Sequence, residues 1–332
     1  MTVLDYQPLS RARSWRTPLS ARHIPVVATT AVWLFLVAAA SIRYPGFLSW
    51  QVLLNLLRDN AFLGVSAVGM TFVILSGGID LSVGAMIGLA SILIGSLMTR
   101  HGWPAACAVS LALVIGVVFG AAMGIVIAFI ELPPFLVTLA GMFLARGLAQ
   151  VISLETISIN GTFYSALDDF GDRFFPVTAL LFLVTLVAGI HIAHQTRFGR
   201  AVYAIGGNEH SAVLMGVPVR WTKVKIYALS GLCSALAGVV YTLYTSSGNA
   251  NAGSMLELDA IAAVVIGGTP LTGGVGYVLG TLMGVLILGT IQTIITFEGT
   301  LSSWWTKIAI GVLLLAFILL QRFVQRRVER RR

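Results

Sequence analysis

The sequence predicts an all-α integral membrane protein with about ten transmembrane helices, and three observations lead to this fold class. First, the 332 residues are 57% hydrophobic and only 10% charged, whereas soluble domains have about 45–50% apolar and about 25% charged residues. Second, long apolar runs recur along the whole chain. Third, most basic residues lie between these runs. In water, the polar groups could not cover so much apolar surface, so the expected solvent is the bilayer.

The apolar runs predict the individual helices in chain order. A crossing needs about 20 apolar residues, and lipid requires each segment to satisfy its own backbone as a helix. The eighth run is short and ends in glycines, so it is expected to be a broken or re-entrant segment. The runs cover residues 24–42, 60–76, 83–99, 105–130, 135–152, 176–194, 225–246, 259–267, 276–297 and 303–321.

The distribution of charge predicts the orientation of these helices. Fifteen of the 21 basic residues flank apolar runs in three groups, which is the positive-inside pattern of cytoplasmic segments. Their placement therefore favours membrane topology over nucleic-acid binding as the reason for the net charge of +8. The groups are Arg11, Arg13, Arg16 and Arg22; Arg197, Arg200, Arg220, Lys223 and Lys225; and Arg322, Arg326, Arg327, Arg330, Arg331 and Arg332.

The same pattern predicts the domain organisation. Residues 1–23 and 322–332 are expected to be basic cytoplasmic tails around a membrane domain at 24–321. The interval 153–175 then lies outside, and its charged residues are mostly acidic: Glu155, Asp168, Asp169 and Asp172 against Arg173. The first run has basic residues before it and three alanines near its end, like a signal peptide. It is longer than a usual signal-peptide core, so an uncleaved helix is expected.

Motifs for catalysis, metal binding or nucleotide binding are absent from the sequence. No Gly-x-x-x-x-Gly-Lys-Ser/Thr loop is present to bind ATP phosphates, and no Gly-x-Ser-x-Gly nucleophile motif occurs. His23, His101, His191, His194 and His210 do not form a zinc-binding His-Glu-x-x-His motif. Cys107 and Cys233 lie in apolar runs without motif spacing, so they predict neither a disulfide framework nor a metal site.

Polar residues at membrane depth are the candidates for a solute path. Such groups are costly in hydrocarbon and are expected to face protein or water. On that argument the candidates are Asp80, Thr138, Arg146 and Thr269. For Asp80 a structural role is favoured over direct contact with solute, because its carboxylate can accept hydrogen bonds from the free N–H groups of a helix starting near Ser82.

Glycines mark two further features. Gly116, Gly120 and Gly124 recur every four residues, as do Gly276, Gly280 and Gly284, and small residues at this spacing allow helices to pack closely. Segment 74–84 (ILSGGIDLSVG) also resembles segment 265–276 (VIGGTPLTGGVG). Glycine-interrupted repeats often lie near the path of a transporter. A repeated structural hairpin is favoured here over a contact with solute.

The polar interval from 196 to 225 predicts a short helix on the cytoplasmic face. Asn208 is a good N-cap, and Gly216 is suited to end a helix over residues 210–215. Such a helix could dock into another protein, but a solvated basic loop explains the residues equally well.

Three sequence motifs resemble those of permeases of ABC sugar importers of the ribose/xylose/arabinose type. They are GMTFVILSGGIDLSVG at 69–84, TRFGR with YAIGGN at 196–208, and AVVIGGT at 263–269. The similarity runs from about residue 24 to residue 321. Within this group, DNAFLG at 59–64 and GTLSSWWTK at 299–307 look most like one permease of a galactofuranose importer. The arginine-rich N-terminal tail has no recognised counterpart there.

The resemblance implies a permease fold and a set of partners. These are a cytoplasmic ATPase that binds the ATP, a second homologous permease in a heterodimer, and a periplasmic sugar-binding protein. It also implies a bacterial inner-membrane location with both termini in the cytoplasm, import of a monosaccharide by alternating access, and no covalent chemistry or cofactor in this chain. The ATPase-coupling loop is expected to contain Arg197, Gly199, Arg200, Gly207, Asn208, Glu209, His210 and Gly216.

Two other functions remain as alternatives. An ion-coupled secondary transporter usually has intramembrane carboxylates for coupling, and no chain of Asp, Glu and His crosses the predicted spans. An intramembrane enzyme would need a catalytic cluster at membrane depth, and the sequence has no such cluster.

Overall fold

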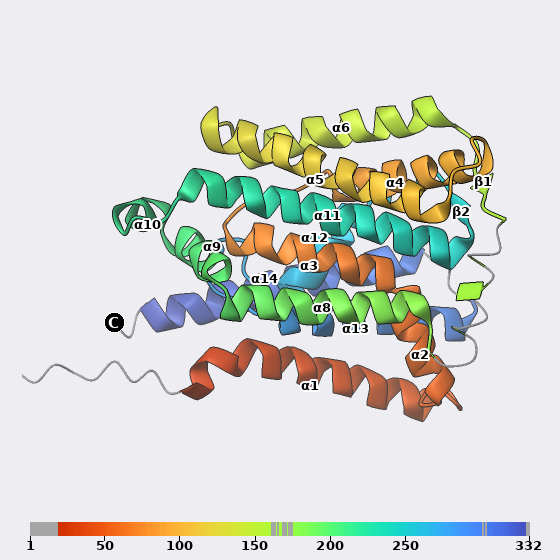
Figure 1. The fold of residues 1–332 in the computed structure, drawn as a ribbon. Coiled ribbons are helices and arrows are strands. Elements are labelled where there is room, and N and C mark those ends of the chain that lie inside the picture. The colour runs from red at the N-terminus through yellow and green to blue at the C-terminus, as the bar shows by residue number, and fades with distance from the viewer. Residues whose placement is uncertain are drawn as a thin grey trace, which may run out of the picture.

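The chain forms a bundle of helices in the computed structural model, which describes residues 19–160, 164, 166–167, 171, 175–300, 302 and 304–329. The long helices run side by side, and both strands lie at one end of the bundle (Figure 1). The helices are α1 (Leu19–Arg43), α2 (Trp50–Asp59), α3 (Ala61–Leu75), α4 (Val83–Thr99), α5 (Ala105–Phe129), α6 (Pro134–Ile152), α8 (Val177–Gln195), α9 (Arg197–Gly207), α10 (Glu209–Leu214), α11 (Val219–Thr245), α12 (Leu256–Ile266), α13 (Val278–Glu298) and α14 (Trp304–Glu329).

Each of the ten predicted apolar runs contains a helix, but a count of ten crossings is not confirmed. Within the part of the chain that the structure describes, six helices are long and apolar enough to span a membrane, or seven if α2 and α3, which are bent by 54° where they meet, form one span. α12 has 11 residues, which is about 16 Å of helix against a hydrocarbon core of about 30 Å. It is therefore too short to cross alone, in agreement with the expectation for the eighth run.

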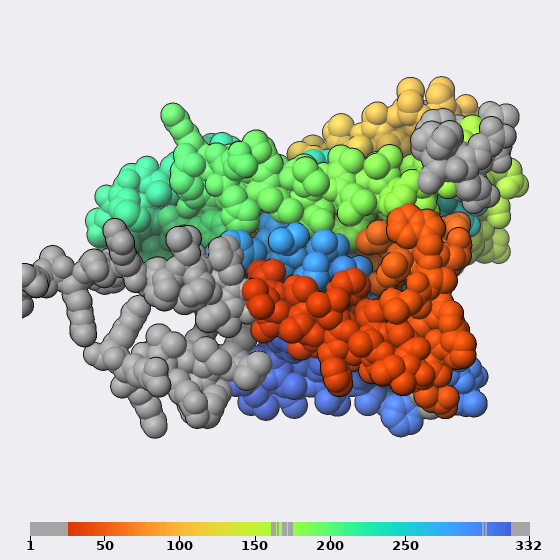
Figure 2. Space-filling model, turned by 90° about the horizontal axis from the view of Figure 1, so that it is seen from below, coloured from red at the N-terminus to blue at the C-terminus, as the bar shows by residue number. Residues whose placement is uncertain are grey.

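Helix α3 lies at the centre of the bundle because it is apolar on every side. All of its residues except Phe62 are buried, as expected for a helix without a polar face. It packs against α8, α11, α12 and α13. On the outside, α1 and α2 lie against α13 (Figure 2), and the indole N–H of Trp33 donates to the hydroxyl of Thr290 at 3.1 Å.

The close contact between α5 and α11 depends on glycines, as the four-residue spacing predicts. A Cβ added at Gly231 would collide with the carbonyl group of Gly116 and lie 3.1 Å from the Cα of Gly120. A Cβ at Gly120 would in turn collide with the carbonyl group of Tyr227. The two backbones therefore approach each other directly, which allows dispersion contacts that side chains would prevent.

The two ends of the bundle differ in structure. Helices α9 and α10, the first residues of α1 and the last residues of α14 lie at one end (Figure 1). At the other end, β1 (Ile157–Ser158) pairs antiparallel with β2 (Ser247–Gly248). Of the predicted outer loop, Asp168, Asp169, Asp172 and Arg173 lie outside the described residues, as do residues 1–18 and 330–332 of the predicted tails.

The glycine contact gives a test of the packing. Gly231→Val is expected to lower the free energy of unfolding by about 1–3 kcal/mol, because overpacking forces two backbones apart. The measurement is the midpoint of thermal unfolding of the purified chain in detergent, read by fluorescence size-exclusion chromatography. The control is Gly147→Val, since an added Cβ at this helical glycine meets no atom within 4 Å. Equal midpoints for the two variants would contradict the close approach of α5 and α11.

Candidate functional site

Helices α9 and α10 form a protruding element between α8 and α11 (Figure 1). At the start of α9 the Thr196 hydroxyl accepts from the N–H of Gly199 at 3.1 Å. At the start of α10 the Asn208 side chain accepts from the N–H of Ser211 at 2.8 Å. Both are N-cap bonds, which satisfy donors that the first turn of a helix leaves free. The predicted N-cap role of Asn208 is confirmed, and the helix begins one residue earlier than expected.

Gly216 ends α10 as the sequence predicts. Its φ is +79°, a conformation that glycine adopts without the steric penalty of a Cβ. The N–H of Gly216 donates to Val213 O at 2.9 Å, and the N–H of Val217 donates to Ala212 O at 3.0 Å. These two bonds define a Schellman motif, which turns the chain sharply back toward α11.

The tip of this element exposes an apolar surface. Val213, Leu214 and Met215 are 54%, 76% and 69% exposed, and Trp221 at the start of α11 is 58% exposed. Ala212, on the opposite side of α10, is buried with Ile205 and Val219. The helix is therefore anchored on one side, while its free side carries large apolar groups of the kind that mark interaction sites.

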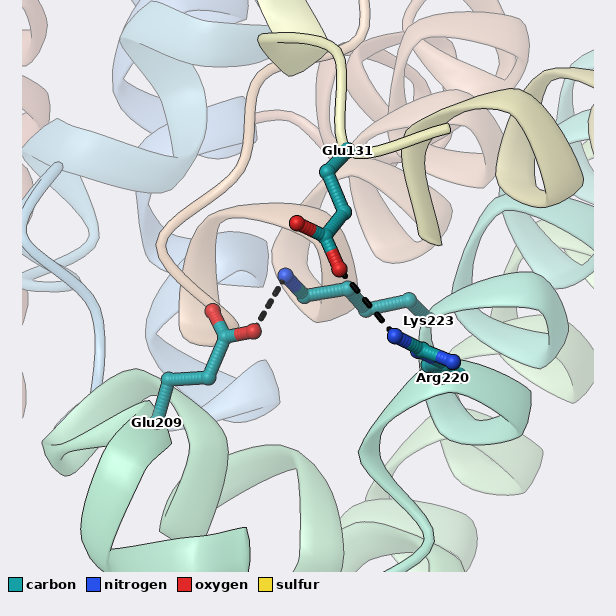
Figure 3. Close-up of polar contacts among 4 residues, drawn as sticks. All are labelled: Glu131, Glu209, Arg220 and Lys223. Atoms are coloured by element: carbon teal, nitrogen blue, oxygen red, sulfur yellow. Dashed lines mark hydrogen bonds and ion pairs between the residues drawn. The ribbon is translucent and has the colours of Figure 1, made fainter. Parts of the chain in front are cut away.

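Two ion pairs lie at the start of α11, one with α10 and one with the turn after α5. Lys223 Nζ lies 2.7 Å from Glu209 Oε1, and Arg220 Nη2 lies 3.1 Å from Glu131 Oε1. Figure 3 shows both carboxylates reaching toward the start of α11. These four residues help to line a groove of about 660 Å³. The side chains of the Arg220–Glu131 pair are 61% and 71% exposed, so solvent screening leaves that pair about 0–1 kcal/mol.

The inner face of α9 contacts the turn that follows α12. The Tyr203 hydroxyl donates to the carbonyl oxygen of Gly276 at 2.8 Å. Gly206 lies so close to this turn that an added Cβ would stand 2.5 Å from Gly274 N, and it would also collide with the carbonyl oxygen of Leu75 at the end of α3. One helix of the protruding element thus contacts both the end of α3 and the turn between α12 and α13.

The two glycine-containing segments that resemble each other in sequence also lie together in space. The N–H of Gly274 donates to Leu75 O at 2.9 Å, and a Cβ at Gly273 would meet the N–H of Gly77 at 2.7 Å. Close by, the hydroxyls of Thr71 and Thr281 are 2.7 Å apart. The predicted pair of hairpins is therefore a pair of turns in direct contact, which we call the paired glycine turns (residues 76–80 and 267–276).

Asp80 stabilises the second half of its turn. Its side chain is buried and accepts from Ser82 N at 2.9 Å, Ser82 Oγ at 2.6 Å and Ser230 Oγ at 2.7 Å. Ser82 precedes the first residue of α4 and Ser230 belongs to α11. The carboxylate therefore meets the start of α4, as expected, and also joins α4 to α11.

Of the other three predicted path residues, Thr138 and Thr269 lie at the paired glycine turns, and Arg146 bonds elsewhere. Thr138 is buried and donates to Pro134 O at 2.9 Å and to Ile79 O at 3.3 Å, beside the turn of Asp80. Arg146 Nη1 donates to Ala250 O at 2.6 Å and to Ala252 O at 3.0 Å. Thr269 is buried against Gly276. Arg146 faces protein, as expected, through the segment between β2 and α12.

The predicted coupling residues divide between the surface and the inside of the element. Gly199 is buried against the last turn of α8, where an added Cβ would stand 2.5 Å from the carbonyl carbon of Ala193. The exposed members of this set are Arg197, Arg200, Gly207, Asn208, Glu209, His210 and Gly216.

Sequence reasoning missed α9 and its contacts. The signals were present: Thr196 as N-cap, and Phe198, Val202 and Ile205 at helical spacing. Tyr203 gave no such signal, because its partner is 73 residues away in sequence. Asp259 and Lys307 were also missed. They fall in two predicted apolar runs and form an ion pair at 2.5 Å.

Comparison with known proteins identifies relatives over nearly the whole chain. The family described as "Branched-chain amino acid transport system / permease component" matches residues 52–318. The inner membrane ABC transporter permease protein YjfF of Escherichia coli K12 is 51% identical over 306 residues, which cover 91% of this chain and 92% of the relative. No solved structure gives a significant match.

Two further relatives have names that include a sugar. The ribose import permease protein RbsC of Bacillus subtilis is 44% identical over 86% of this chain and 89% of its own length. The fructose import permease protein FruG of Bifidobacterium longum is 38% identical, with coverages of 92% and 93%. From the family match and these identities, the chain belongs to the ABC transporter permease family and is a permease component of the ribose-type sugar importers.

Proposed function

We propose that this permease imports a monosaccharide by alternating access, driven by an ATPase that binds to the α9–α10 element. The main support is the geometry of that element, which exposes an apolar tip and contacts the paired glycine turns with its inner face. The solute is proposed to be galactofuranose or a related pentose or hexose. The curated relatives named for ribose and fructose support a monosaccharide.

The proposed assembly contains this chain, a second homologous permease, a cytoplasmic ATPase and a periplasmic sugar-binding protein. The membrane domain would be residues 24–321, and both basic tails would lie in the cytoplasm, following the positive-inside rule. The α9–α10 end would then face the ATPase, and the end with β1 and β2 would face the binding protein.

The tip of α10 is the proposed docking point for the ATPase. Buried apolar anchors supply most of the energy of a protein interface, and a polar rim surrounds them. Leu214 and Met215 would be such anchors, with Arg197, Arg200, Glu209 and His210 around them. Asn208 and Gly216 would fix the shape of the helix, since they begin and end it. Gly199 would hold α9 against α8, and Gly207 would join the two short helices.

A movement of the α9–α10 element would displace the paired glycine turns at the centre of the bundle. At Gly206 the backbone of α9 is in direct contact with Leu75 and Gly274. A displacement of α9 would therefore move both of the paired glycine turns at once. The first turn continues to Asp80 and so to α4, and the second leads into α13. Packed elements of this kind switch between discrete arrangements more readily than they deform. Asp80, Thr138, Arg146 and Thr269 are proposed to lie near the path that opens.

The docking proposal predicts that a charge at the tip of α10 removes the ATPase. Leu214→Glu, in the tagged chain expressed with its partners, is expected to lose the ATPase in a pull-down from mild detergent and to keep the second permease. The control is Leu154→Glu near β1, because Leu154 is 78% exposed and Leu214 is 76% exposed. Replacing residues 208–216 by a Gly/Ser linker should have the same effect as Leu214→Glu.

Transport by the chain alone would overturn the proposal. A chain that purifies alone and moves sugar into liposomes without ATP would be a secondary transporter, and any dependence on an ion gradient would identify its coupling ion.

The link through α9 predicts a separation of ATP hydrolysis from transport. Tyr203→Phe removes only the hydroxyl that bonds to Gly276, a bond with a net value of about 0.5–1.5 kcal/mol. Sugar uptake by the complete complex in proteoliposomes is expected to fall about two- to tenfold, while ATP hydrolysis is retained. The control is Tyr241→Phe, which keeps the ring contact with Phe62. A parallel loss of ATP hydrolysis and uptake in Tyr203→Phe would contradict the role given to this bond.

A further inference from the structure

A second polar groove lies between the start of α3 and the helices α12, α13 and α14. Its volume is about 630 Å³, within the range of about 300–1,000 Å³ typical of small-molecule sites. It is separate from the groove beside α10 and from the four path residues predicted from the sequence. Its lining residues are Asn60, Leu63, Asp259, Leu288, Gln292, Ile295, Thr296, Gly299, Trp304, Thr306, Lys307 and Ile310.

The groove contains charged and amide side chains on helices that are otherwise apolar. Asp259 and Lys307 form an ion pair at 2.5 Å, and their side chains are 20% and 39% exposed. Gln292 and Thr296 belong to α13, which is apolar enough to span a membrane. Charged and amide groups on such helices are costly next to lipid and are expected to face a water-filled cavity or protein. The groove is therefore expected to hold water and polar solutes.

The lining matches the chemistry of an uncharged sugar. Each sugar hydroxyl can both donate and accept a hydrogen bond, and the groove offers acceptors on Asp259, donors on Lys307 and both on the Gln292 amide. Trp304 is 70% exposed at its rim, and an indole provides a flat apolar surface together with an N–H donor. The apolar face of a sugar ring could pack on that surface while its hydroxyls bond to the polar groups.

The position of the groove is consistent with entry from outside the cell. Helix α13 starts just after Gly276, the residue that bonds to α9, and Gln292 lies about 21 Å further along its axis. The groove is thus far from the proposed ATPase side. Both segments that carry the finer sequence resemblance, 59–64 and 299–307, contribute to its lining.

We propose that this groove is the site at which the permease first holds the incoming monosaccharide. The inference rests on the proposed import of a monosaccharide and adds a location and a set of contacts to it. The ion pair fixes the positions of Asp259 and Lys307, Gln292 bonds to hydroxyls, and Trp304 contacts the ring.

The first test compares matched variants in the complete transporter. Trp304→Ala and Gln292→Leu are expected to reduce uptake of the labelled sugar about tenfold at saturating binding protein, the effect of losing one or two contacts with the solute. Trp305→Ala and Gln51→Leu make the same chemical changes at exposed positions outside the groove and should leave uptake unchanged. The amount of assembled complex is measured for every variant.

The second test measures contact with sugar directly. Thr296→Cys, in a Cys107→Ser background that leaves only the buried Cys233, is expected to react with a charged, membrane-impermeant thiol reagent added from outside. Free D-ribose, D-fructose or D-galactose, whichever the transporter imports, should slow that reaction. A cysteine that never reacts would show that the second permease or lipid covers the groove. A cysteine that reacts without protection, together with normal uptake by Trp304→Ala, would show a water-filled crevice only.

These outcomes separate the two proposals. If the unmodified complex imports no pentose or hexose with ATP, galactofuranose included, the proposed function fails. If it imports one of them, and the variants and the protection assay give no effect, only the assignment of the groove fails.

Discussion

The bundle depends on how the ends of its interrupted helices satisfy their backbone groups without water. A helix that stops within the hydrophobic part of a membrane protein leaves N–H and C=O groups that lipid cannot satisfy. Here the carbonyl group of Leu75, at the end of α3, accepts from the N–H of Gly274 in the turn after α12. Asp80 supplies acceptors for Ser82 at the start of α4 and for Ser230 of α11. These few bonds join the ends of α3 and α4 to α11 and to the turn between α12 and α13.

The same constraint on backbone groups explains how the exposed α9–α10 element is connected to the paired glycine turns at the centre of the bundle. The paired glycine turns are narrow because glycine leaves room for backbone to meet backbone, and α9 occupies the remaining side through Tyr203 and Gly206. The element that carries the exposed apolar tip is therefore packed against the least regular part of the bundle. Elsewhere, α5 and α11 are held in tight contact by glycines, so they are suited to move as one body.

Sequence reasoning located most helices because lipid demands long apolar runs, and their lengths are readable without tertiary information. It also located α10, since its N-cap and its C-terminal glycine act locally. It missed α2 and α9, whose mixed polar and apolar residues did not form a continuous run. It could not give the count of crossings, because an apolar run does not show whether its helix crosses the membrane. The short α12 is apolar but too short to cross alone, and it packs against neighbouring helices. Pairs such as Tyr203–Gly276 and Asp259–Lys307 join residues 73 and 48 positions apart, and only the fold brings them together. For the same reason, the sequence did not show that three of the four polar residues chosen by depth, Asp80, Thr138 and Thr269, lie at the paired glycine turns.

The charges at the start of the short helix α12 influence which solutes the neighbouring groove can bind. A helix N-terminus carries a partial positive charge of about half an elementary charge, which would attract an anion. In α12 the first turn contains Glu257 and Asp259, and Asp259 also neutralises Lys307. The positive groups at this place are thus matched by carboxylates of the protein itself. A neutral sugar can bind here without disturbing that balance, whereas a sugar phosphate would add two negative charges beside existing ones. The groove would therefore discriminate by charge before it discriminates by shape.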